Sequence, residues 1–585
     1  MYKLRESQIE VLEKAEQAIK AGKRHIFIEA PTGTGKSIIG IELARRLQKT
    51  EEGPSTFLLT AEKILQRQYE DSVNEFGLNG ITSITGIDNY KCHLNGEKFS
   101  LGVCKSMGMG NRKALEKLAC ASSCEYLQKW VEAQAAPVAV FNYSYYFIQM
   151  NYVLRKLEAY APFQKRSLII ADEAHRLPDL LEEHFNATID RSWIEVIKNC
   201  ADRLREEEVY IPFTGAQWGV FAKLISALFK NKYKDKEGHF EALKNIYKFL
   251  TELAEKISES KIQLQRKYNI DLGEGDSATD IYSAWQTASE AVPPSVYHFN
   301  RVADAIKDYT CKIEDYIQII NDFGLEAMII SGEHNKRIFR IFNDQALFEK
   351  FYQPFGDTFI YMSATLQPEV LMKRLGIKND DAEIIRVSTK WDPNNSPIHT
   401  LNTANFSFAN KEAIAESIDE IDAIIEKHKN ERGIIHTTSY AIAEQIKQQS
   451  KHSKRFLVYQ GTAEKTNLLN LLHKSADDAV ILAPSMSEGV DLKNDLSRFQ
   501  IICKISYPNI SDALWMIRSR KQQFVYVATA VNTIIQQSGR SIRNENDFAT
   551  TYILDSRFTK NFKRLSKYFT PEFKARLEAG KDTAK

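Results

Sequence analysis

A phosphate-binding loop is the clearest chemical signal in the sequence. It consists of Ala30, Pro31, Thr32, Gly33, Thr34, Gly35, Lys36 and Ser37. The loop follows a short apolar run and opens a helical one, which is the context that phosphate binding requires. The glycines let backbone N–H groups turn toward phosphate oxygens. Lys36 can reach the terminal phosphates, and the Ser37 hydroxyl can ligate Mg²⁺. A plain glycine-rich turn is the alternative, but it requires neither the lysine nor the flanking elements.

Two carboxylates follow another apolar strand. Asp172 and Glu173 begin the segment Asp172-Glu173-Ala174-His175, directly after the run Ser167–Ala171. Ligands bind at the carboxyl ends of parallel strands. We expect Asp172 to hold Mg²⁺ through water and Glu173 to orient the attacking water as general base. An acidic turn alone is commonly just solvated, but beside a phosphate loop it predicts nucleotide hydrolysis.

A basic segment near the C-terminus supplies a third set of groups. It reads Gln536-Gln537-Ser538-Gly539-Arg540-Ser541-Ile542-Arg543. Arg540 and Arg543 are three residues apart, so on a helix they share a face. They can reach across a cleft to the nucleotide and act as arginine fingers that stabilise charge on a transferring phosphate. We expect Gln536 to act from the same side of that cleft as the arginines. The alternative interpretation is a solvated basic helix.

Four of the seven cysteines lie within 33 residues, at positions 92, 104, 120 and 124. The spacing of Cys92, Cys104, Cys120 and Cys124 lacks the two close pairs of a zinc finger. Four thiolates suit either a tetrahedral zinc ion or a [4Fe–4S] cluster. The spacing leaves both open, and four unrelated free thiols remain the third possibility.

Alternating strand-like and helical segments must position these groups. Residues 1–75 predict a helix near Ser7–Ala21, a strand His25–Glu29, a helix from Lys36 and a strand Thr56–Thr60. This βαβ pattern predicts a parallel sheet, which resumes at Leu168–Ala171 and Thr358–Met362. A second α/β unit begins after residue 395, with strands at Gly433–His436, Arg455–Val458, Ala479–Ala483, Gln500–Ile505 and Thr551–Leu554.

Residues 190–325 have helical periodicity and predict a separate insertion. Two apolar stripes run along it, one of Trp218, Phe221, Leu224, Ile225 and Leu228, the other of Leu243, Ile246, Tyr247, Leu250, Leu253 and Ile257. Such stripes are typical of helices that bury one face. We interpret both as core packing.

Composition limits the class of protein. The chain has 585 residues, 43% hydrophobic and 26% charged, with a net charge of +2, which is typical of a folded globular protein. The sequence has no apolar run of 18 or more residues, so we expect no membrane span. The charged segment Met1–Glu10 is unlike a secretory signal. We therefore expect a cytoplasmic protein. A chain without extra terminal domains favours a bacterial, archaeal or phage-infected cell as its source. The balanced charge neither supports nor excludes nucleic-acid binding.

The order of the motifs resembles that of superfamily 2 helicases. Arg5 and Gln8 resemble the element that recognises adenine in these helicases. Thr60 and Gln68 resemble the motif that contacts the backbone of the nucleic-acid strand. Three further segments resemble the third, fourth and fifth motifs: Ser363-Ala364-Thr365, His436-Thr437-Thr438-Ser439-Tyr440 and Ser487-Glu488-Gly489-Val490-Asp491. The resemblance implies that Glu488, Gly489 and Asp491 lie at the nucleotide site.

More narrowly, the chain resembles the XPD/DinG family. The cysteine segment precedes the Asp-Glu-Ala-His box, a helical insertion follows that box, and Cys124-Glu125-Tyr126 with Val138–Tyr143 resembles the exit from the family's metal domain. Ser37 and Ser541 depart from the family's usual residues. The resemblance implies an α/β fold with two RecA-like motor domains, and an iron–sulfur insertion and a helical arch insertion in the first. It implies ATP, Mg²⁺ and a [4Fe–4S] cluster as cofactors.

This resemblance also implies an activity and its partners. The expected enzyme is a monomeric ATP-dependent DNA helicase that moves 5′→3′ on single-stranded DNA and opens duplex junctions, alongside other repair or replication proteins. The alternatives are a translocase that displaces proteins or R-loops without general unwinding, and a non-hydrolysing, ATP-gated DNA-binding module. Glu173 and Arg540 argue against the second alternative.

The expected domains follow the motif order along the chain. Motor domain 1 comprises residues 1–79, 138–189 and 341–394, interrupted by an iron–sulfur domain at 80–137 and a helical arch at 190–340, and motor domain 2 comprises residues 395–585.

Overall fold

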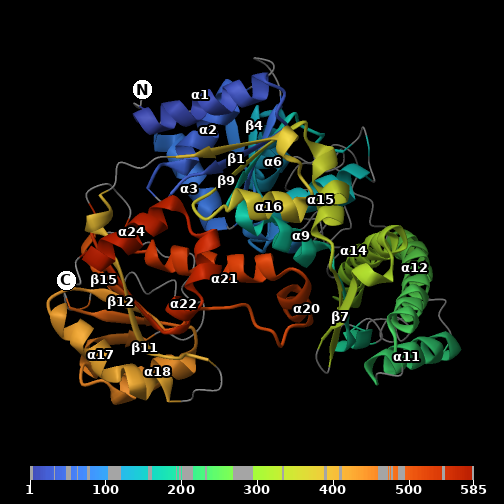
Figure 1. The fold of residues 1–585 in the computed structure, drawn as a ribbon. Helices are drawn as coiled ribbons and strands as arrows, with labels where there is room; N and C mark the ends of the chain where they lie inside the picture. The colour runs from blue at the N-terminus through green and yellow to red at the C-terminus, as the bar shows by residue number, and fades with distance from the viewer. Residues whose placement is uncertain are drawn as a thin grey trace. The chain divides into compact units, whose positions relative to one another are not determined.

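The computed structural model of the chain divides into two compact units (Figure 1). The first comprises Met1–Leu43, Ala171–His175 and Phe359–Lys585, and the second comprises Ala44–Ile170 and Arg176–Thr358. The structure describes residues 4–31, 33–47, 54–61, 63–75, 79–102, 120–155, 158, 161–192, 194–196, 199, 215–230, 233–267, 294–332, 335–387, 392–407, 412–458, 472, 475, 478–484, 494–542 and 547–582.

In the first unit, β1 (His25–Glu29) lies between two parallel strands, β9 (Thr358–Ser363) and β10 (Ala382–Arg386). All five residues of β1 are buried, as expected for a parallel strand covered on both faces. Phe27 pairs with Tyr361 in register, and their rings stack at 4.6 Å. Two helices flank β1 in sequence, α1 (Glu6–Lys20) and α2 (Lys36–Arg46). The predicted strand–loop–helix pattern is confirmed.

A second sheet of parallel strands also belongs to the first unit. Its order is β11 (Ile398–Ala404), β16 (Thr550–Asp555), β15 (Phe499–Ile502), β12 (Gly433–His436), β14 (Val480–Ala483) and β13 (Phe456–Val458). Successive residues of a strand face opposite sides. Ile501 packs in the cluster that includes α17 (Ala413–Lys427) and α18 (Tyr440–Gln449). Ile502 packs in the cluster that includes α21 (Gln523–Ser538) and α24 (Pro571–Asp582). All five strands predicted for this unit are confirmed.

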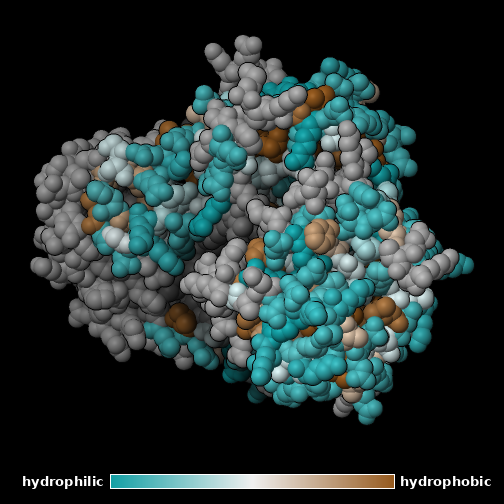
Figure 2. All heavy atoms as spheres, turned by 90° about the vertical axis from the view of Figure 1, so that its left-hand side faces the viewer, coloured by the Kyte–Doolittle hydropathy of each residue, from teal (hydrophilic) through white to brown (hydrophobic). Residues whose placement is uncertain are grey.

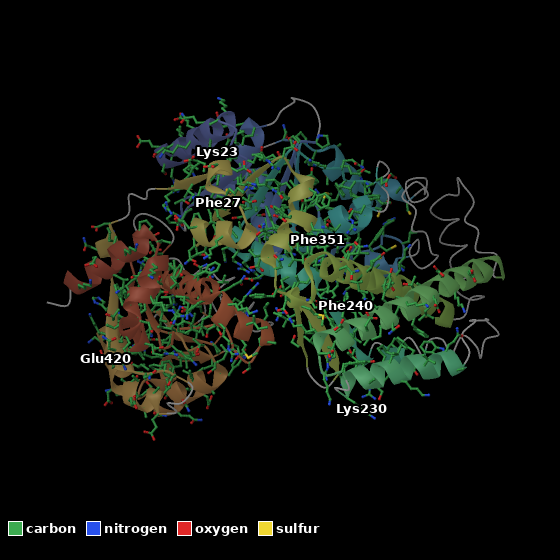
Figure 3. All side chains as sticks on the ribbon, turned by 45° about the vertical axis from the view of Figure 1, so that its right-hand side comes forward. Lys23, Phe27, Lys230, Phe240, Phe351 and Glu420 are labelled. Atoms are coloured by element: carbon green, nitrogen blue, oxygen red, sulfur yellow. The ribbon has the colours of Figure 1, made fainter. Side chains whose placement is uncertain are left out.

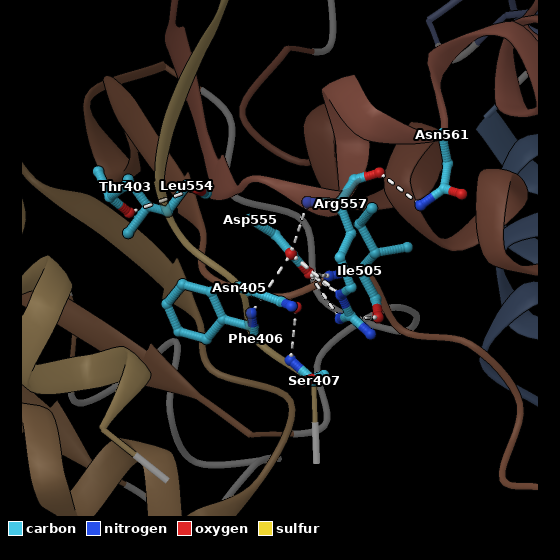
Figure 4. A network of polar contacts seen from close by, with 9 residues as sticks. All are labelled: Thr403, Asn405, Phe406, Ser407, Ile505, Leu554, Asp555, Arg557 and Asn561. Carbon is cyan, nitrogen blue, oxygen red and sulfur yellow. Dashed lines mark hydrogen bonds and ion pairs between the residues drawn. The ribbon is translucent and has the colours of Figure 1, made fainter. Parts of the chain in front are cut away.

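A buried carboxylate joins the ends of three segments of this second sheet (Figure 4). Asp555, at the end of β16, has no exposed surface. It accepts hydrogen bonds from the backbone N–H groups of Phe406 at 3.4 Å and Ile505 at 3.0 Å. It also pairs with Arg557, whose Nη2 lies 2.6 Å from Oδ2. These contacts satisfy a charge that would otherwise be costly to bury.

In the second unit, β4 (Val138–Asn142) lies parallel to β2 (Thr56–Thr60) on one side and β3 (Ile81–Ser83) on the other. Arg166 is buried and donates to the carbonyl oxygens of Thr56 at 2.8 Å and Ala133 at 2.9 Å. Its guanidinium also lies over the Phe57 ring. Burial lowers the pKa of Arg166 to about 9. This arginine fixes α6 (Glu125–Ala135) against the start of β2.

Within the described residues of the region predicted as helical, three long helices are present: α11 (Gly215–Phe229), α12 (Lys236–Lys267) and α14 (Pro294–Phe323). Both apolar stripes pack inward, with Leu228 and Leu243 fully buried. Figure 3 shows Phe240 of α12 and Phe351 of α15 (Asp344–Phe351) among packed elements, and Lys230 at the surface. The interpretation of the stripes as core packing is confirmed.

The sequence analysis did not anticipate a small antiparallel sheet in the second unit. Its order is β6 (Ala187–Asp190), β8 (Lys336–Ile341) and β7 (Met328–Ser331). The residues of these strands are only partly buried, so the strands lack the continuous apolar run by which a buried parallel strand is recognised.

Among the helices that the structure describes, none is long and apolar enough to cross a membrane. On the face drawn in Figure 2, most of the coloured surface is hydrophilic, and hydrophobic residues lie in small separate patches.

Candidate nucleotide-binding site

The phosphate loop connects β1 to α2 in the first unit. Gly33 and Gly35 have φ angles of +82° and +78°, a backbone region that glycine adopts readily and other residues do not. A Cβ atom on Gly35 would lie 2.5 Å from Gln8 Nε2. The N–H of Ala30 donates to the carbonyl of Ser363 at 3.1 Å, which joins the start of the loop to the end of β9. Thr32 lies outside the described residues.

Two residues of the N-terminal segment form hydrogen bonds with the backbone of the phosphate loop. Arg5 donates to the carbonyl of Gly33 at 2.9 Å, and the buried side chain of Gln8 donates to the carbonyl of Thr34 at 3.0 Å. Arg5 N–H also donates to Gln8 Oε1 at 3.0 Å, which orients the amide. Both residues therefore contact the loop backbone. Their expected role in reading adenine stays a prediction.

The two acidic residues of the second motif lie at the end of β5 (Leu168–Asp172). Asp172 is buried, and its Oδ1 accepts the N–H of Glu173 at 2.9 Å. Glu173 has a φ of +50°, a strained conformation for a residue with a side chain, of a kind that clusters at active sites. Lys36 and Ser37, half-buried, begin α2. The carboxylates and the loop are therefore parts of the same unit.

A hydrogen-bonded chain connects Glu173 to the predicted arginine motif. Ser363 Oγ donates to Glu173 Oε2 at 2.8 Å, and His175 Nδ1 lies 2.8 Å from the same hydroxyl. On its other side, His175 Nε2 lies 3.2 Å from Gln536 Nε2. Gln536 also lies 3.4 Å from Thr365 Oγ1. One polar network thus joins three motifs that are far apart in sequence.

The electrostatics of this network keep Glu173 ionised. Burial by itself raises the pKa of Glu173, but the hydrogen bond from His175, the charge of Lys36 and the hydrogen bond from Ser363 together lower it below its usual value. An ionised carboxylate can accept a proton from water, which a general base must do.

Arg540 follows α21 and lies near a buried histidine of β12. Burial, and next the positive charge of Arg540, lower the pKa of His436 to about 3. His436 therefore stays neutral at physiological pH and adds no competing charge beside the arginine. Four residues assigned to the nucleotide site, Arg543, Glu488, Gly489 and Asp491, lie outside the described residues.

A cavity of about 260 Å³ beside the loop includes residues that the sequence analysis missed. Its walls carry Pro31 of the loop, Glu29 and Arg386 of the first sheet, and Glu572 and Arg576 of α24. Burial raises the pKa of Glu29, and Arg386, whose Nε lies 3.0 Å from it, opposes the rise. Isolated residues of this kind match no motif, so their sequence carried no signal.

Three of the four clustered cysteines are described, and all lie in the second unit. Cys92, Cys120 and Cys124 are free thiols. Burial raises the pKa of Cys120, and the Cys124 and Cys92 thiols raise it further. Cys104 lies outside the described residues. Within the described ranges, no group of three or more His, Cys, Asp or Glu is arranged to hold a metal ion.

Two family models match separate parts of the chain. Residues 422–575 match the family model described as helicase C-terminal domain, and residues 1–215 match that of the type III restriction enzyme res subunit. No curated protein matches the chain. The fold is similar to a solved XPD helicase, with a TM-score of 0.58 and 15% identity over 97% of this chain and 98% of that one. It is also similar to Xpd4 of S. tokodaii, with a TM-score of 0.58 and 14% identity over 96% and 98%.

The chain therefore carries a match to a helicase C-terminal domain over residues 422–575 and has the fold of solved XPD helicases. The fold is α/β with parallel sheets and corresponds to the two RecA-like motor domains of solved XPD helicases, as the sequence predicted. The insertion boundaries and the roles of the individual site residues stay predictions.

Proposed function

We propose that the chain is an ATP-dependent DNA helicase that moves 5′→3′ on single-stranded DNA and unwinds duplexes. The observation that carries this proposal is the network from Glu173 through Ser363 and His175 to Gln536. It connects the proposed general base to the helix that precedes Arg540, and so it provides a physical route by which hydrolysis changes the contact between motor elements.

In the proposed reaction, Lys36 binds the terminal phosphates, and Ser37 and Asp172 hold Mg²⁺, which neutralises phosphate charge when bound. Glu173 orients the attacking water and accepts its proton. Arg540 and Arg543 stabilise the charge that develops in the transition state. Ser363 and His175 hold the Glu173 carboxylate in place through their hydrogen bonds to it and to each other.

Strand-displacement assays test this function. We expect ATP-dependent opening of a duplex with a 5′ single-stranded tail, and none of a matched duplex with a 3′ tail, because the motor must load on the strand along which it moves. Phosphate release should rise with single-stranded DNA. Opening only of the 3′-tailed duplex would contradict the polarity.

The same assays separate the alternatives. A translocase without general unwinding would remove streptavidin from a 5′-tailed biotinylated strand while leaving the duplex closed. An ATP-gated binding module would bind DNA but release no phosphate. Size-exclusion with light scattering during turnover tests the proposed monomer. We propose duplex junctions, with repair or replication proteins near them, as partners, and the cytoplasm as the compartment.

We further propose that Cys92, Cys104, Cys120 and Cys124 hold a [4Fe–4S] cluster. Four thiolates are the donors that such a cluster takes, and the three described cysteines of the set are free thiols. When bound, the cluster would supply a rigid cross-link to a small insertion that has little core of its own. The chain itself buries Cys92 and Cys124, and it packs the rings of Tyr90 and Tyr126, each two residues from one of these cysteines, 5.4 Å apart.

Cys120→Ser tests the cluster. We expect the variant to lose the brown absorbance of the anaerobically purified protein and to lose unwinding, while ATP hydrolysis largely remains, because the cysteines lie outside the unit that contains the phosphate loop. Ser123→Ala, three residues away, is the matched control and should keep both. Zinc without iron in the purified protein would contradict the cluster. Parallel loss of ATPase activity and unwinding would contradict its independence.

A further inference from the structure

The C-terminal helix α24 packs directly on the backbone of the second sheet. A Cβ atom on Gly580 would lie only 2.1 Å from the carbonyl oxygen of Ile398 in β11. On its inner face, Phe573 and Leu577 are buried in the same core cluster as Val531 and Ile534 of α21. The position of α24 is therefore fixed by close packing against both β11 and α21.

Arg576 joins α24 to the end of α21. Its side chain is 3% exposed. Nη2 donates to the carbonyl of Ser538 at 2.9 Å, and Nη1 to the Ser538 hydroxyl at 3.3 Å. Nε donates to the carbonyl of Ser396 at 2.9 Å. Ser538 is the last residue of α21, and the chain turns there toward Arg540.

Satisfying the Ser538 carbonyl does not require Arg576. Gln500 Nε2 already donates to the same oxygen at 2.8 Å. Burying a guanidinium is costly unless its charge and hydrogen bonds are compensated, and burial lowers the pKa of Arg576 while Glu572 raises it. Because the guanidinium bonds both Ser396 and Ser538, it fixes where α21 ends relative to the start of β11.

The helix also reaches the phosphate loop. Glu572, one turn before Arg576, lines the 260 Å³ cavity together with Pro31 of the loop. Burial raises the pKa of Glu572, and the charges of Arg576 and then Lys36 oppose the rise. One helix therefore contacts the surroundings of the proposed phosphate-binding lysine and the turn that carries the proposed arginine finger.

We propose that Arg576 is a positioning residue for the proposed hydrolysis: it fixes the turn after α21 and, through that turn, the guanidinium of Arg540. The inference rests on the proposed function. Arg576 acts through Ser538, because the nitrogen atoms of its guanidinium donate three hydrogen bonds to Ser538 and Ser396 rather than to substrate. The transition state needs the arginine finger in one geometry, whereas ATP binding in the ground state depends on it much less.

Arg576→Ala tests this inference in the full-length protein. We expect kcat for DNA-stimulated ATP hydrolysis to fall on the order of 10²-fold, the loss that a misplacement of about 1 Å can cause. The Kd of a fluorescent non-hydrolysable ATP analogue with Mg²⁺ should stay at the parental value. Arg576→Lys, which keeps the charge but has fewer donors, should give an intermediate kcat.

Arg455 provides the matched control within the same unit. It bonds backbone carbonyls too, those of Ile425, His428 and Glu431 near the end of α17. Arg455→Ala should lower the melting temperature and leave kcat unchanged. If kcat falls equally in Arg455→Ala and Arg576→Ala, the loss is general loosening of the domain and the inference is wrong.

Two further outcomes keep the test decisive. If Arg576→Ala does not fold, Arg576→Lys decides, and parental kcat in that variant overturns the inference. If the parental protein hydrolyses ATP and the Arg576 variants match it, only this inference fails. If the parental protein releases no phosphate with DNA present, the proposed function fails and the positioning role fails with it.

Discussion

Glu173→Gln is expected to bind ATP with parental affinity and to hydrolyse almost none of it. The amide has nearly the shape of the carboxylate, so its oxygen can keep the bond from Ser363 Oγ, but it cannot accept a proton from water. Loss of a general base costs about 10²- to 10⁴-fold in rate. Single-turnover phosphate release with saturating DNA measures the chemical step, and a fluorescent ATP analogue measures binding.

A second substitution at the same site separates binding from chemistry. Lys36→Ala removes the positive charge that is proposed to bind the phosphates. The variant should therefore have lower nucleotide affinity as well as lower turnover. Glu182→Gln, which disturbs a buried carboxylate paired with Arg340 in the second unit, is the control. It should lower stability but keep the turnover of the folded protein. Parental turnover in either Glu173→Gln or Lys36→Ala would show that the assigned site is wrong.

Arg540→Ala should lower turnover on the order of 10³-fold or more and leave ATP affinity nearly unchanged, because an arginine finger acts mainly on transition-state charge. A second readout follows from His436. The positive charge of Arg540 contributes to the low pKa of His436, after burial. Removing that charge should raise the pKa of His436, which NMR titration of the imidazole can detect.

Arg498→Ala is the control for this prediction. Arg498 lies in the same unit, and carboxylates of Asp495 and Asp547 hold its guanidinium at 2.8 and 2.7 Å. Its loss should affect stability and not kcat. If Arg540→Ala weakens nucleotide binding while kcat remains parental, Arg540 is a structural residue.

Short segments of sequence were enough to predict the local structure of the site. The glycines with positive φ, the buried strand before them and the helix after them are all consecutive, so their pattern predicts the phosphate loop directly. Nine of the parallel strands were predicted for the same reason, because a buried strand is an apolar run that needs no knowledge of its neighbours. Four others, β3, β4, β10 and β11, were not predicted as strands. The order of the motifs then predicted a helicase, and residues 422–575 match the helicase C-terminal domain model.

Only the tertiary structure decided which side chains meet. Gln536 and His175 are 361 residues apart, and Ser363 Oγ bonds to Glu173, 190 residues away. Arg5 and Gln8 bond to carbonyls of the loop, a partnership that their spacing did not reveal.

The role of Arg576 could not be predicted from the sequence. Its partners, Ser538 at the end of α21 and Ser396 before β11, depend on how α24 packs. Periodicity and turn chemistry are properties of consecutive residues. Hydrogen bonds across a fold require instead that donor and acceptor approach to about 3 Å, within a few tenths of an ångström. These distances are set only when the elements pack against one another.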